Sequence, residues 1–171
     1  MIELGKNQPL TATCARGLEM VLADELRAIG ATAVAPDRGS VLFSGDLRTV
    51  YDVNLRLRTA MRVLVPLVRG EVKSREGLYD LAASVAWDEV IGDGQTFAVE
   101  VVGRHRGFRN TTFGGQVVKD AAVDRLRSKR GRRPNVDREA PDIRVHLRLF
   151  EKGASTLSLD SSGEPLSHRG Y

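Results

Sequence analysis

Apolar residues in the first 70 positions recur with two different periods, which predict strands and helices in alternation. Short apolar or β-branched runs predict strands at residues 10–15, 32–35, 40–44 and 62–68. Between these runs, apolar residues spaced three and four positions apart predict two helices. The residues expected to line their buried faces are Leu18, Val21, Leu22, Leu26 and Ile29 in the first, and Leu47, Val50, Tyr51 and Leu55 in the second.

Residues typical of helix ends and turns support the boundaries of these elements. Gly30 follows the first helix and suits the left-handed residue that ends a helix. Asp46 precedes the second helix and is a residue type that caps helix starts. Residues 36–39 have the composition of a turn between two strands. The resulting order, β-α-β-β-α-β, is that of a ferredoxin-like unit with two helices on one face of an antiparallel sheet. We assign this unit to residues 1–70.

A second unit of mixed strands and helices is predicted over residues 71–161. A polar break at 70–74 precedes a helix at 77–85, and Trp87, Val90 and Ile91 are expected to anchor that helix on a sheet. Residues 96–102 predict a strand. Residues 142–149 alternate apolar with polar side chains, which predicts a strand with one solvated face. Residues 155–159 are expected to pair with it as a hairpin, after a turn at Lys152 and Gly153.

A longer helix is predicted between these strands, at residues 113–129. Its core-facing positions by helical spacing are Val117, Val118, Ala121, Ala122 and Leu126. The whole chain is therefore expected to have an α/β (α+β) fold in two parts.

Composition narrows the class of protein. The 171 residues are 42% hydrophobic, enough for real cores, and only 5% aromatic, too few for extended base-stacking surfaces. Cys14 is the one cysteine, which excludes an internal disulfide and fits a reducing compartment. We expect it to be a small buried apolar group. No apolar run approaches the length of a membrane span. These features predict a soluble, cytoplasmic protein.

Charge is concentrated in one stretch. Residues 104–138 contain 11 Lys or Arg and 3 Asp or Glu, a net charge of +8, whereas the whole chain carries +4. An acidic remainder with one basic strip is typical of a protein that binds a polyanion such as RNA. The alternative is a solvated, arginine-rich surface without a ligand. Phosphate contacts are predicted for Arg104, Arg106, Arg109, Lys119, Arg125, Lys129, Arg130, Arg132 and Arg133.

Two glycines in the first turns of the long predicted helix leave two interpretations open. Gly114 and Gly115 cost about 2 kcal/mol together relative to alanine inside a helix, so something requires them. One reason would be a phosphate contact with the helix backbone. The other would be close packing of the helix on the sheet. Nearby Phe108 has two interpretations as well, stacking on a base or packing in the core.

Catalytic and metal-binding patterns are missing from the sequence. His105, His146 and His168 lack the spacing of metal ligands. There is no Gly-x-Ser-x-Gly nucleophile motif and no glycine-rich phosphate-binding loop. We therefore expect no catalytic residue, metal or cofactor in this chain by itself.

Several stretches resemble one family along nearly the whole chain: TATCARGLEMVLADEL, LYDLAASVAWDEV, TFAVEV, RRPNVDREAPDIRVHL and LSLDSSGEPLSHRGY. The family is the bacterial 23S ribosomal RNA guanine-N2 methyltransferases of the RlmL type, also described as N6-adenine-specific DNA methylases. The resemblance implies a ferredoxin-like subdomain followed by a THUMP domain, an RNA-binding module with a mixed sheet and flanking helices. It also implies that residues 162–171 are a linker to a methyltransferase domain that this sequence lacks.

The resemblance implies a function as well. The chain would capture structured RNA, ribosomal RNA first of all, for a catalytic domain that uses S-adenosylmethionine. The sequence favours a fragment of such an enzyme. Two alternatives stay open: a separately encoded THUMP adaptor in tRNA modification, and a protein-interaction domain that uses its basic strip. In the motif RPNVDR, we expect Pro134, Asn135 and Asp137 to form a turn rather than to bind RNA.

Overall fold

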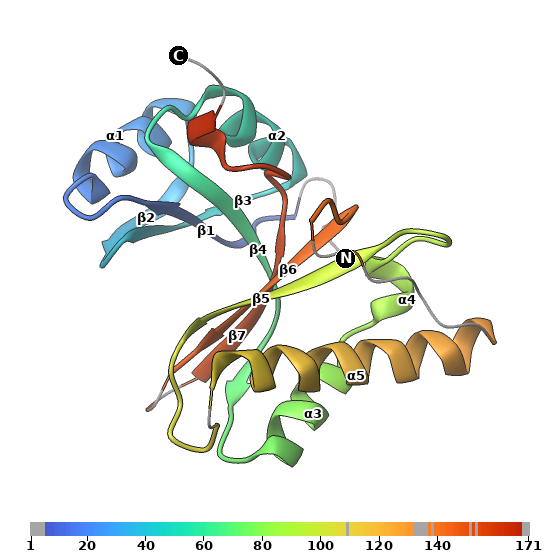
Figure 1. The fold of residues 1–171 in the computed structure, drawn as a ribbon. Coiled ribbons are helices and arrows are strands. Elements are labelled where there is room, and N and C mark those ends of the chain that lie inside the picture. The colour runs from blue at the N-terminus through green and yellow to red at the C-terminus, as the bar shows by residue number, and fades with distance from the viewer. Residues whose placement is uncertain are drawn as a thin grey trace. The chain divides into compact units, whose positions relative to one another are not determined.

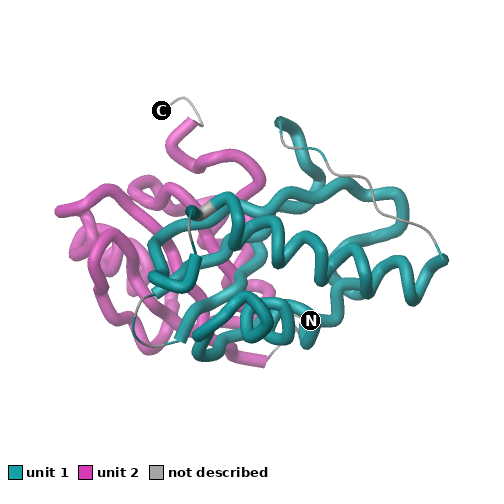
Figure 2. The backbone as a smooth tube through the Cα atoms, turned by 60° about the horizontal axis from the view of Figure 1, so that its bottom comes forward, with its two compact units in different colours: residues 1, 67–159 teal, residues 2–66, 160–171 magenta. Residues whose placement is uncertain are grey.

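The computed structural model describes residues 6–108, 110–131, 137, 139–150, 152 and 154–168. The chain forms two compact units (Figure 2). The N-terminal unit contains residues 2–66 together with 160–171, and the C-terminal unit contains residues 67–159. The exact domain limits drawn from the sequence stay a prediction. None of the helices in the described ranges has the length and apolar character needed to cross a membrane.

The N-terminal unit has the predicted order of elements (Figure 1). Its strands are hydrogen bonded in the order β2-β3-β1-β4, and each neighbouring pair is antiparallel. This is the ferredoxin-like arrangement expected from the sequence. The elements are β1 (Gln8–Cys14), α1 (Glu19–Ile29), β2 (Thr32–Asp37), β3 (Ser40–Gly45), α2 (Leu47–Arg56) and β4 (Ala60–Glu71).

The predicted helix boundaries of this unit are confirmed. Gly30 has a φ of 92° and its N–H donates to the carbonyl of Arg27, which ends α1. Asp46 caps α2 by accepting a hydrogen bond from the N–H of Thr49 at 2.9 Å. That bond, with one from the Thr49 hydroxyl, holds the pKa of Asp46 below its ordinary value. Cys14 is buried, as expected, and burial raises the pKa of its thiol.

The predicted apolar faces of α1 and α2 are too wide. Leu22 and Leu26 are fully buried, but Val21 is 48% exposed. In α2, Tyr51 and Leu55 are 70% and 74% exposed. The sheet contacts only a narrow stripe of each helix, so apolar residues at the margin of the pattern stay in solvent.

The C-terminal unit contains the second part of β4 and six further elements (Figure 1). Its strand order is β4-β7-β6-β5, with β5 parallel to β6 and β6 antiparallel to β7. The predicted hairpin is thereby confirmed. The elements are α3 (Arg75–Ala83), α4 (Trp87–Val90), β5 (Phe97–Gly103), α5 (Thr111–Arg130), β6 (Ile143–Leu149) and β7 (Ala154–Asp160).

The core of this unit lies between the sheet and the two helices α3 and α5. All five residues predicted to face the core from α5 are buried. Trp87 is fully buried, and its indole N–H donates to the carbonyl of Ala82 at 2.8 Å. Trp87 therefore anchors α4 in the core, as the sequence indicated.

Two sequence predictions for this unit are wrong. The polar break at 70–74 is in part a strand, because β4 continues to Glu71. The polar face of β6 is not uniformly solvated, since His146 is only 6% exposed and its Nε2 lies 3.5 Å from Glu100 on β5. Neighbouring strands supply cover that an alternating sequence pattern cannot show.

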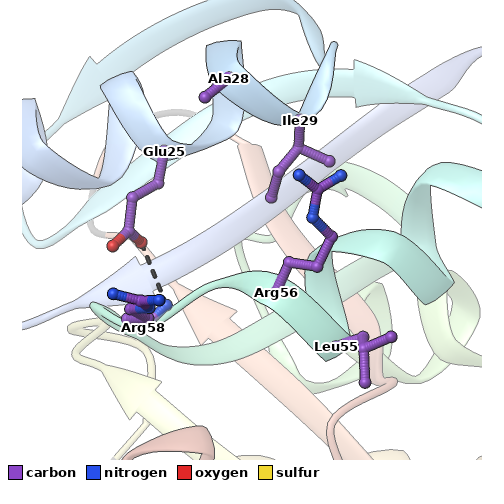
Figure 3. A pocket seen from close by; sticks show the side chains of 6 residues that line it. All are labelled: Glu25, Ala28, Ile29, Leu55, Arg56 and Arg58. Atoms are coloured by element: carbon purple, nitrogen blue, oxygen red, sulfur yellow. Dashed lines mark hydrogen bonds between the residues drawn. The ribbon is translucent and has the colours of Figure 1, made fainter.

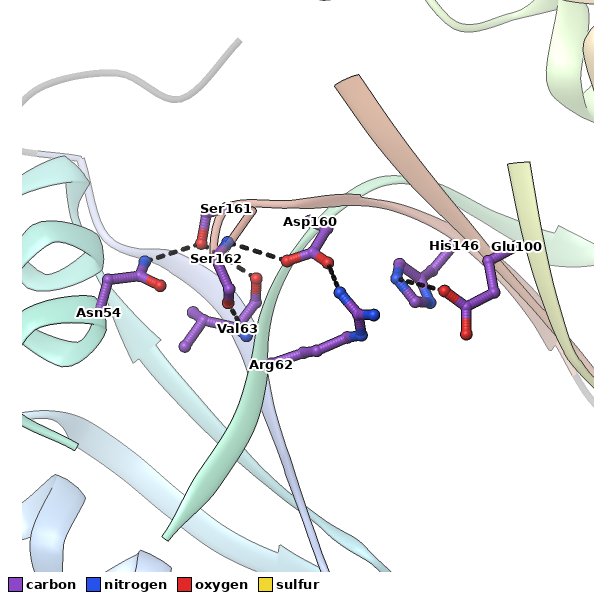
Figure 4. A network of polar contacts seen from close by, with 8 residues as sticks. All are labelled: Asn54, Arg62, Val63, Glu100, His146, Asp160, Ser161 and Ser162. Carbon is purple, nitrogen blue, oxygen red and sulfur yellow. Dashed lines mark hydrogen bonds and ion pairs between the residues drawn. The ribbon is translucent and has the colours of Figure 1, made fainter. Parts of the chain in front are cut away.

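The chain returns to the N-terminal unit after β7 (Figure 4). Asp160 forms an ion pair with Arg62 on β4, and the Ser162 hydroxyl accepts a hydrogen bond from the N–H of Val63 at 2.7 Å. The amide of Asn54 on α2 donates to the Ser161 hydroxyl at 2.9 Å. Leu166 in the short 3-10 helix Leu166–His168 is buried. Segments about 100 residues apart in sequence thus complete one unit.

A substitution at Gly103 should test the close approach of the end of β5 to β6. Gly103 has a φ of 91°, and a methyl group there would overlap the carbonyl oxygen of Leu149 on the adjacent strand. Gly103→Ala should lower the unfolding free energy by about 2–5 kcal/mol, from left-handed strain and steric overlap together. Urea unfolding followed by circular dichroism would measure the loss.

Gly94→Ala is the matched control. Gly94 has a φ of 78° but no atom within 4 Å of the added methyl group, so only the backbone strain of about 1–2 kcal/mol applies. Equal losses from the two variants would contradict the tight pairing of Gly103 with Leu149.

Candidate nucleic-acid interface

The parallel pair β5 and β6, connected through α5, places three chain segments at one edge of the C-terminal unit. Gly103 at the end of β5 pairs with Leu149 at the end of β6. The first turn of α5 lies at the same edge, because a methyl group at Gly114 would come within 3.3 Å of Leu149. Figure 1 shows the ends of β5 and β6 and the start of α5 at this edge. We call this edge, formed by the described parts of residues 103–113 and 148–152, the carboxyl edge.

The loop after β5 presents its arginines around a buried anchor. Phe108 is 8% exposed and belongs to the core, which supports the core interpretation of this residue. The ring of His105 lies 5.2 Å from that of Phe108, and its Nδ1 accepts from the N–H of Gly107 at 3.0 Å. Arg104 and Arg106 are exposed in this loop. The predicted contact at Arg109 lies outside the described residues.

The start of α5 explains the two glycines. Asn110 caps the helix, and its side-chain oxygen accepts from the N–H of Phe113 at 2.8 Å. A methyl group at Gly114 or Gly115 would come within 3.3 Å of Leu149 or 3.1 Å of Val101, so both glycines face the sheet. They also lie beyond the first four N–H groups of the helix, which are the unpaired ones. Close packing of the helix on the sheet accounts for both glycines.

The basic strip of the sequence is divided between two ends of the unit. Helix α5 has 20 residues, which separates its ends by about 28 Å at 1.5 Å per residue. Arg104 and Arg106 precede one end, and Lys129 and Arg130 lie at the other. Lys119 lies between them and is half-buried. The predicted site residues that the structure describes therefore do not form a single cluster.

Two arginines near the end of α5 hold helix α4 in place. Arg125 forms an ion pair with Asp88, with a nitrogen–oxygen distance of 2.9 Å. The hydrogen bond from Arg125 holds the pKa of Asp88 below its ordinary value, and the charge of Lys129 adds to the effect. Arg130 donates to the carbonyl oxygens of Asp88 at 2.8 Å and Ile91 at 2.6 Å. These contacts give Arg125 and Arg130 a structural role that charge counting did not show.

The remaining predictions for this end of the strip are only partly described. Lys129 is exposed, whereas Arg132 and Arg133 lie outside the described residues, as do Pro134 and Asn135. The side chain of Asp137 accepts hydrogen bonds from the N–H groups of Glu139 and Ala140 at 2.9 and 3.2 Å. Asp137 is thus a turn-forming residue, as expected.

The carboxyl edge contains three residues that the sequence reasoning missed. The guanidinium carbon of Arg148 lies 5.0 Å from the ring centre of Phe150, and this ring is 38% exposed. Lys152 is exposed in the turn that follows. The parallel pairing of β5 with β6 brings them to the loop of Arg104, and a strand–helix–strand pattern in the sequence could have indicated this.

A concave surface lies in the N-terminal unit, between α1 and the end of α2 (Figure 3). Its lining residues are Glu25, Ala28, Ile29, Leu55, Arg56 and Arg58. Glu25 accepts hydrogen bonds from the N–H groups of Arg58 and Thr59, both at 3.2 Å, so it is engaged in holding the chain after α2. Among the described residues, no group of three or more His, Cys, Asp or Glu side chains could hold a metal ion.

Comparison with known proteins agrees with this architecture of a ferredoxin-like unit followed by a second α/β unit. Residues 9–64 match the RlmL ferredoxin-like domain, and residues 72–160 match the THUMP domain. The chain therefore belongs to the THUMP domain family, with an RlmL-type ferredoxin-like domain in front. This confirms the resemblance seen in the sequence.

Relatives and solved structures show the same relationship. The chain is 46% identical, over 95% of its length, to the ribosomal RNA large subunit methyltransferase K/L of Pseudomonas entomophila, but spans only 22% of that protein. A predicted N6-adenine-specific DNA methylase from Listeria monocytogenes matches 97% of the chain with a TM-score of 0.83 and 26% identity, and the match covers 43% of that structure. TrmN from Thermus thermophilus matches 96% with a TM-score of 0.73 and 25% identity, covering 48% of its chain.

Substitution of Arg130 should show that this arginine stabilises the fold whereas an exposed arginine on the same helix does not. Arg130→Ala removes two charge-assisted hydrogen bonds to carbonyl oxygens, so the unfolding free energy should fall by about 2 kcal/mol. Arg127→Ala is the control on the same helix, since its side chain is 67% exposed and lies 3.6 Å from Asp124. It should change stability by less than about 0.5 kcal/mol in the same urea titration. Equal effects would refute the bracing role of Arg130.

The ion pair of Arg125 with Asp88 predicts a pH dependence. Because the folded pKa of Asp88 is lowered, its stabilising contribution is present above the unfolded pKa of about 3.9 and is lost as pH falls through the folded value. Arg125→Ala should raise the pKa of Asp88 in an NMR titration of side-chain carboxyl carbons. The difference in melting temperature between variant and wild type should shrink as the pH falls below the pKa of Asp88 in the folded wild type. An unchanged Asp88 titration would contradict the ion pair.

Proposed function

We propose that this chain is the RNA-binding module of an S-adenosylmethionine-dependent ribosomal RNA guanine-N2 methyltransferase. In this proposal it captures structured RNA in the cytoplasm and presents it to a catalytic methyltransferase domain of a longer protein. Membership of the THUMP family supports the proposal, as does the 46% identity to a protein named ribosomal RNA large subunit methyltransferase K/L. S-adenosylmethionine would bind to the catalytic domain, and this chain would supply RNA affinity.

The observation that carries the proposal is the basic carboxyl edge. Arg104 and Arg106 project from a loop anchored by Phe108, and Arg148 and Lys152 approach from the neighbouring strand end. Double-helical RNA hides its base edges in a deep groove, so proteins recognise it through phosphates and shape. Arginine and lysine side chains at one exposed edge suit this mode of binding.

The carboxyl edge is a better candidate than the far end of α5. At the far end, Arg125 and Arg130 are engaged by Asp88 and the α4 carbonyl groups, and these contacts would have to break before either guanidinium could bind a phosphate fully. Lys129 remains exposed there and could add a long-range contribution. Arg104 and Arg106 are exposed at the same edge as Arg148 and Lys152, so we propose that the main phosphate contacts are made there.

Salt titration of RNA binding tests the proposal. Replacing both Arg104 and Arg106 by Ala should weaken binding to a structured ribosomal RNA hairpin. The slope of log affinity against log salt concentration should also fall by about 1.5, because each phosphate contact contributes about 0.7–0.9. Fluorescence anisotropy with a labelled hairpin would measure both quantities.

A control removes the same charge elsewhere. Arg38 and Arg48 have exposed side chains in the N-terminal unit, and their double replacement by Ala should leave the slope nearly unchanged. Equal losses from both pairs would show that binding is not localised at the carboxyl edge. No RNA binding by the wild-type chain even at low salt would overturn the proposed function in favour of a protein partner. A preference for tRNA over ribosomal RNA hairpins would instead favour a tRNA-modification adaptor.

A further inference from the structure

Two of the five phenylalanines are exposed, and both lie at the carboxyl edge. Phe43, Phe97 and Phe108 are between 0% and 8% exposed, as core residues normally are. Phe113, in the first turn of α5, is 40% exposed, and Phe150, just after β6, is 38% exposed. A chain with few aromatic residues thus exposes two rings beside its basic loop.

Phe150 lies on a sheet face with two further partly exposed side chains. Phe150 follows the last residue of β6, and its ring lies beside the Arg148 guanidinium, so the two side chains are on the same side of the sheet. Val102 on β5 is the register partner of Arg148 and is 50% exposed. Leu147 and Leu149, which alternate with these residues, are buried in the core beneath α5. Val102, Arg148 and Phe150 therefore form a surface on the face of the sheet opposite α5, which we call the outer platform.

The outer platform combines the groups that stack on nucleobases. The Arg148 guanidinium is planar and lies 5.0 Å from the centre of the Phe150 ring. Aromatic rings and guanidinium planes both stack on unpaired bases, and the arginine charge can hold the adjoining phosphate. A base inside a duplex already stacks on both sides, so only an unpaired base offers a free face.

We propose that Phe150 and Arg148 form a stacking platform for one unpaired base of the bound RNA. The proposal rests on the proposed function and refines it, because it names the RNA feature that is read: an unpaired nucleotide next to a structured stem. Phosphates of the stem would be held by Arg104 and Arg106, and the unpaired base would cross the edge onto the outer face of the sheet. Structured RNA with a single-stranded neighbour would then be preferred over a fully paired stem.

The matched pair of RNAs is a hairpin stem with a short single-stranded overhang and the same stem without it, the overhang carrying 2-aminopurine. Wild-type chain should bind the overhang RNA more tightly and quench the fluorescence of its 2-aminopurine. Phe150→Leu keeps an apolar side chain but removes the ring, so it should abolish the quenching and weaken binding of the overhang RNA by about fivefold or more. Binding of the stem alone should not change.

Two further variants separate stacking from folding and charge. Phe150→Trp keeps a ring and should retain quenching and the preference for the overhang. Arg148→Lys keeps the positive charge but removes the planar guanidinium group. It should therefore reduce quenching of 2-aminopurine while leaving the salt dependence of RNA affinity unchanged. Circular dichroism melting should be nearly the same for Phe150→Leu and wild type, because the ring lies at the surface.

The outcomes distinguish this inference from the proposed function. If wild type binds both RNAs equally, or Phe150→Leu still quenches the base, the stacking platform is wrong while RNA binding stands. If wild type binds neither RNA at low salt, the proposed function itself fails. If Phe150→Leu weakens both RNAs equally, or Phe150→Trp fails to restore the preference, Phe150 supports the fold of the edge and does not stack on a base.

Discussion

Parallel pairing of β5 with β6 is the constraint on which the candidate interface depends. Two parallel strands require a crossover, and α5 provides it by packing closely on the sheet through Gly114 and Gly115. The crossover returns the chain so that both strands end at the same edge. Residues 104–108 and Phe150 become neighbours there although more than 40 positions separate them in sequence. Without this pairing, the basic loop and the outer platform would not share an edge.

Arginines in this protein serve the fold and the surface, and their sequence context does not distinguish the two roles. Arg62 pairs with Asp160 at the start of the returning C-terminal segment. Arg125 binds the Asp88 side chain of α4, and Arg130 binds the carbonyl groups of Asp88 and of Ile91 just after that helix. Charge density alone therefore does not separate arginines that hold α4 from arginines that only face solvent. An arginine near a helix end also complements the helix dipole, which favours such positions irrespective of any ligand.

Local patterns were good predictors where neighbouring residues decide the structure. The caps at Gly30 and Asp46, the core face of α5 and the β6–β7 hairpin all follow from spacing and residue type. Predictions failed where a distant element decides exposure. Tyr51 and Leu55 fit a helical apolar pattern but lie beyond the contact with the sheet, and His146 is buried despite a strand pattern that predicts solvent on its side.

The sequence by itself determined the order of the elements, the ferredoxin-like first unit, the charge asymmetry and the family, because each depends on residues close together or on motifs read in line. Only the tertiary structure decided which cations share a surface. It placed Arg104 and Arg106 before one end of α5 and Lys129 and Arg130 at the other. It also engaged Arg125 and Arg130 in contacts with α4 and added Arg148 and Phe150 to the carboxyl edge. The physical reason is strand pairing, since hydrogen bonds between strands join residues irrespective of their distance along the chain.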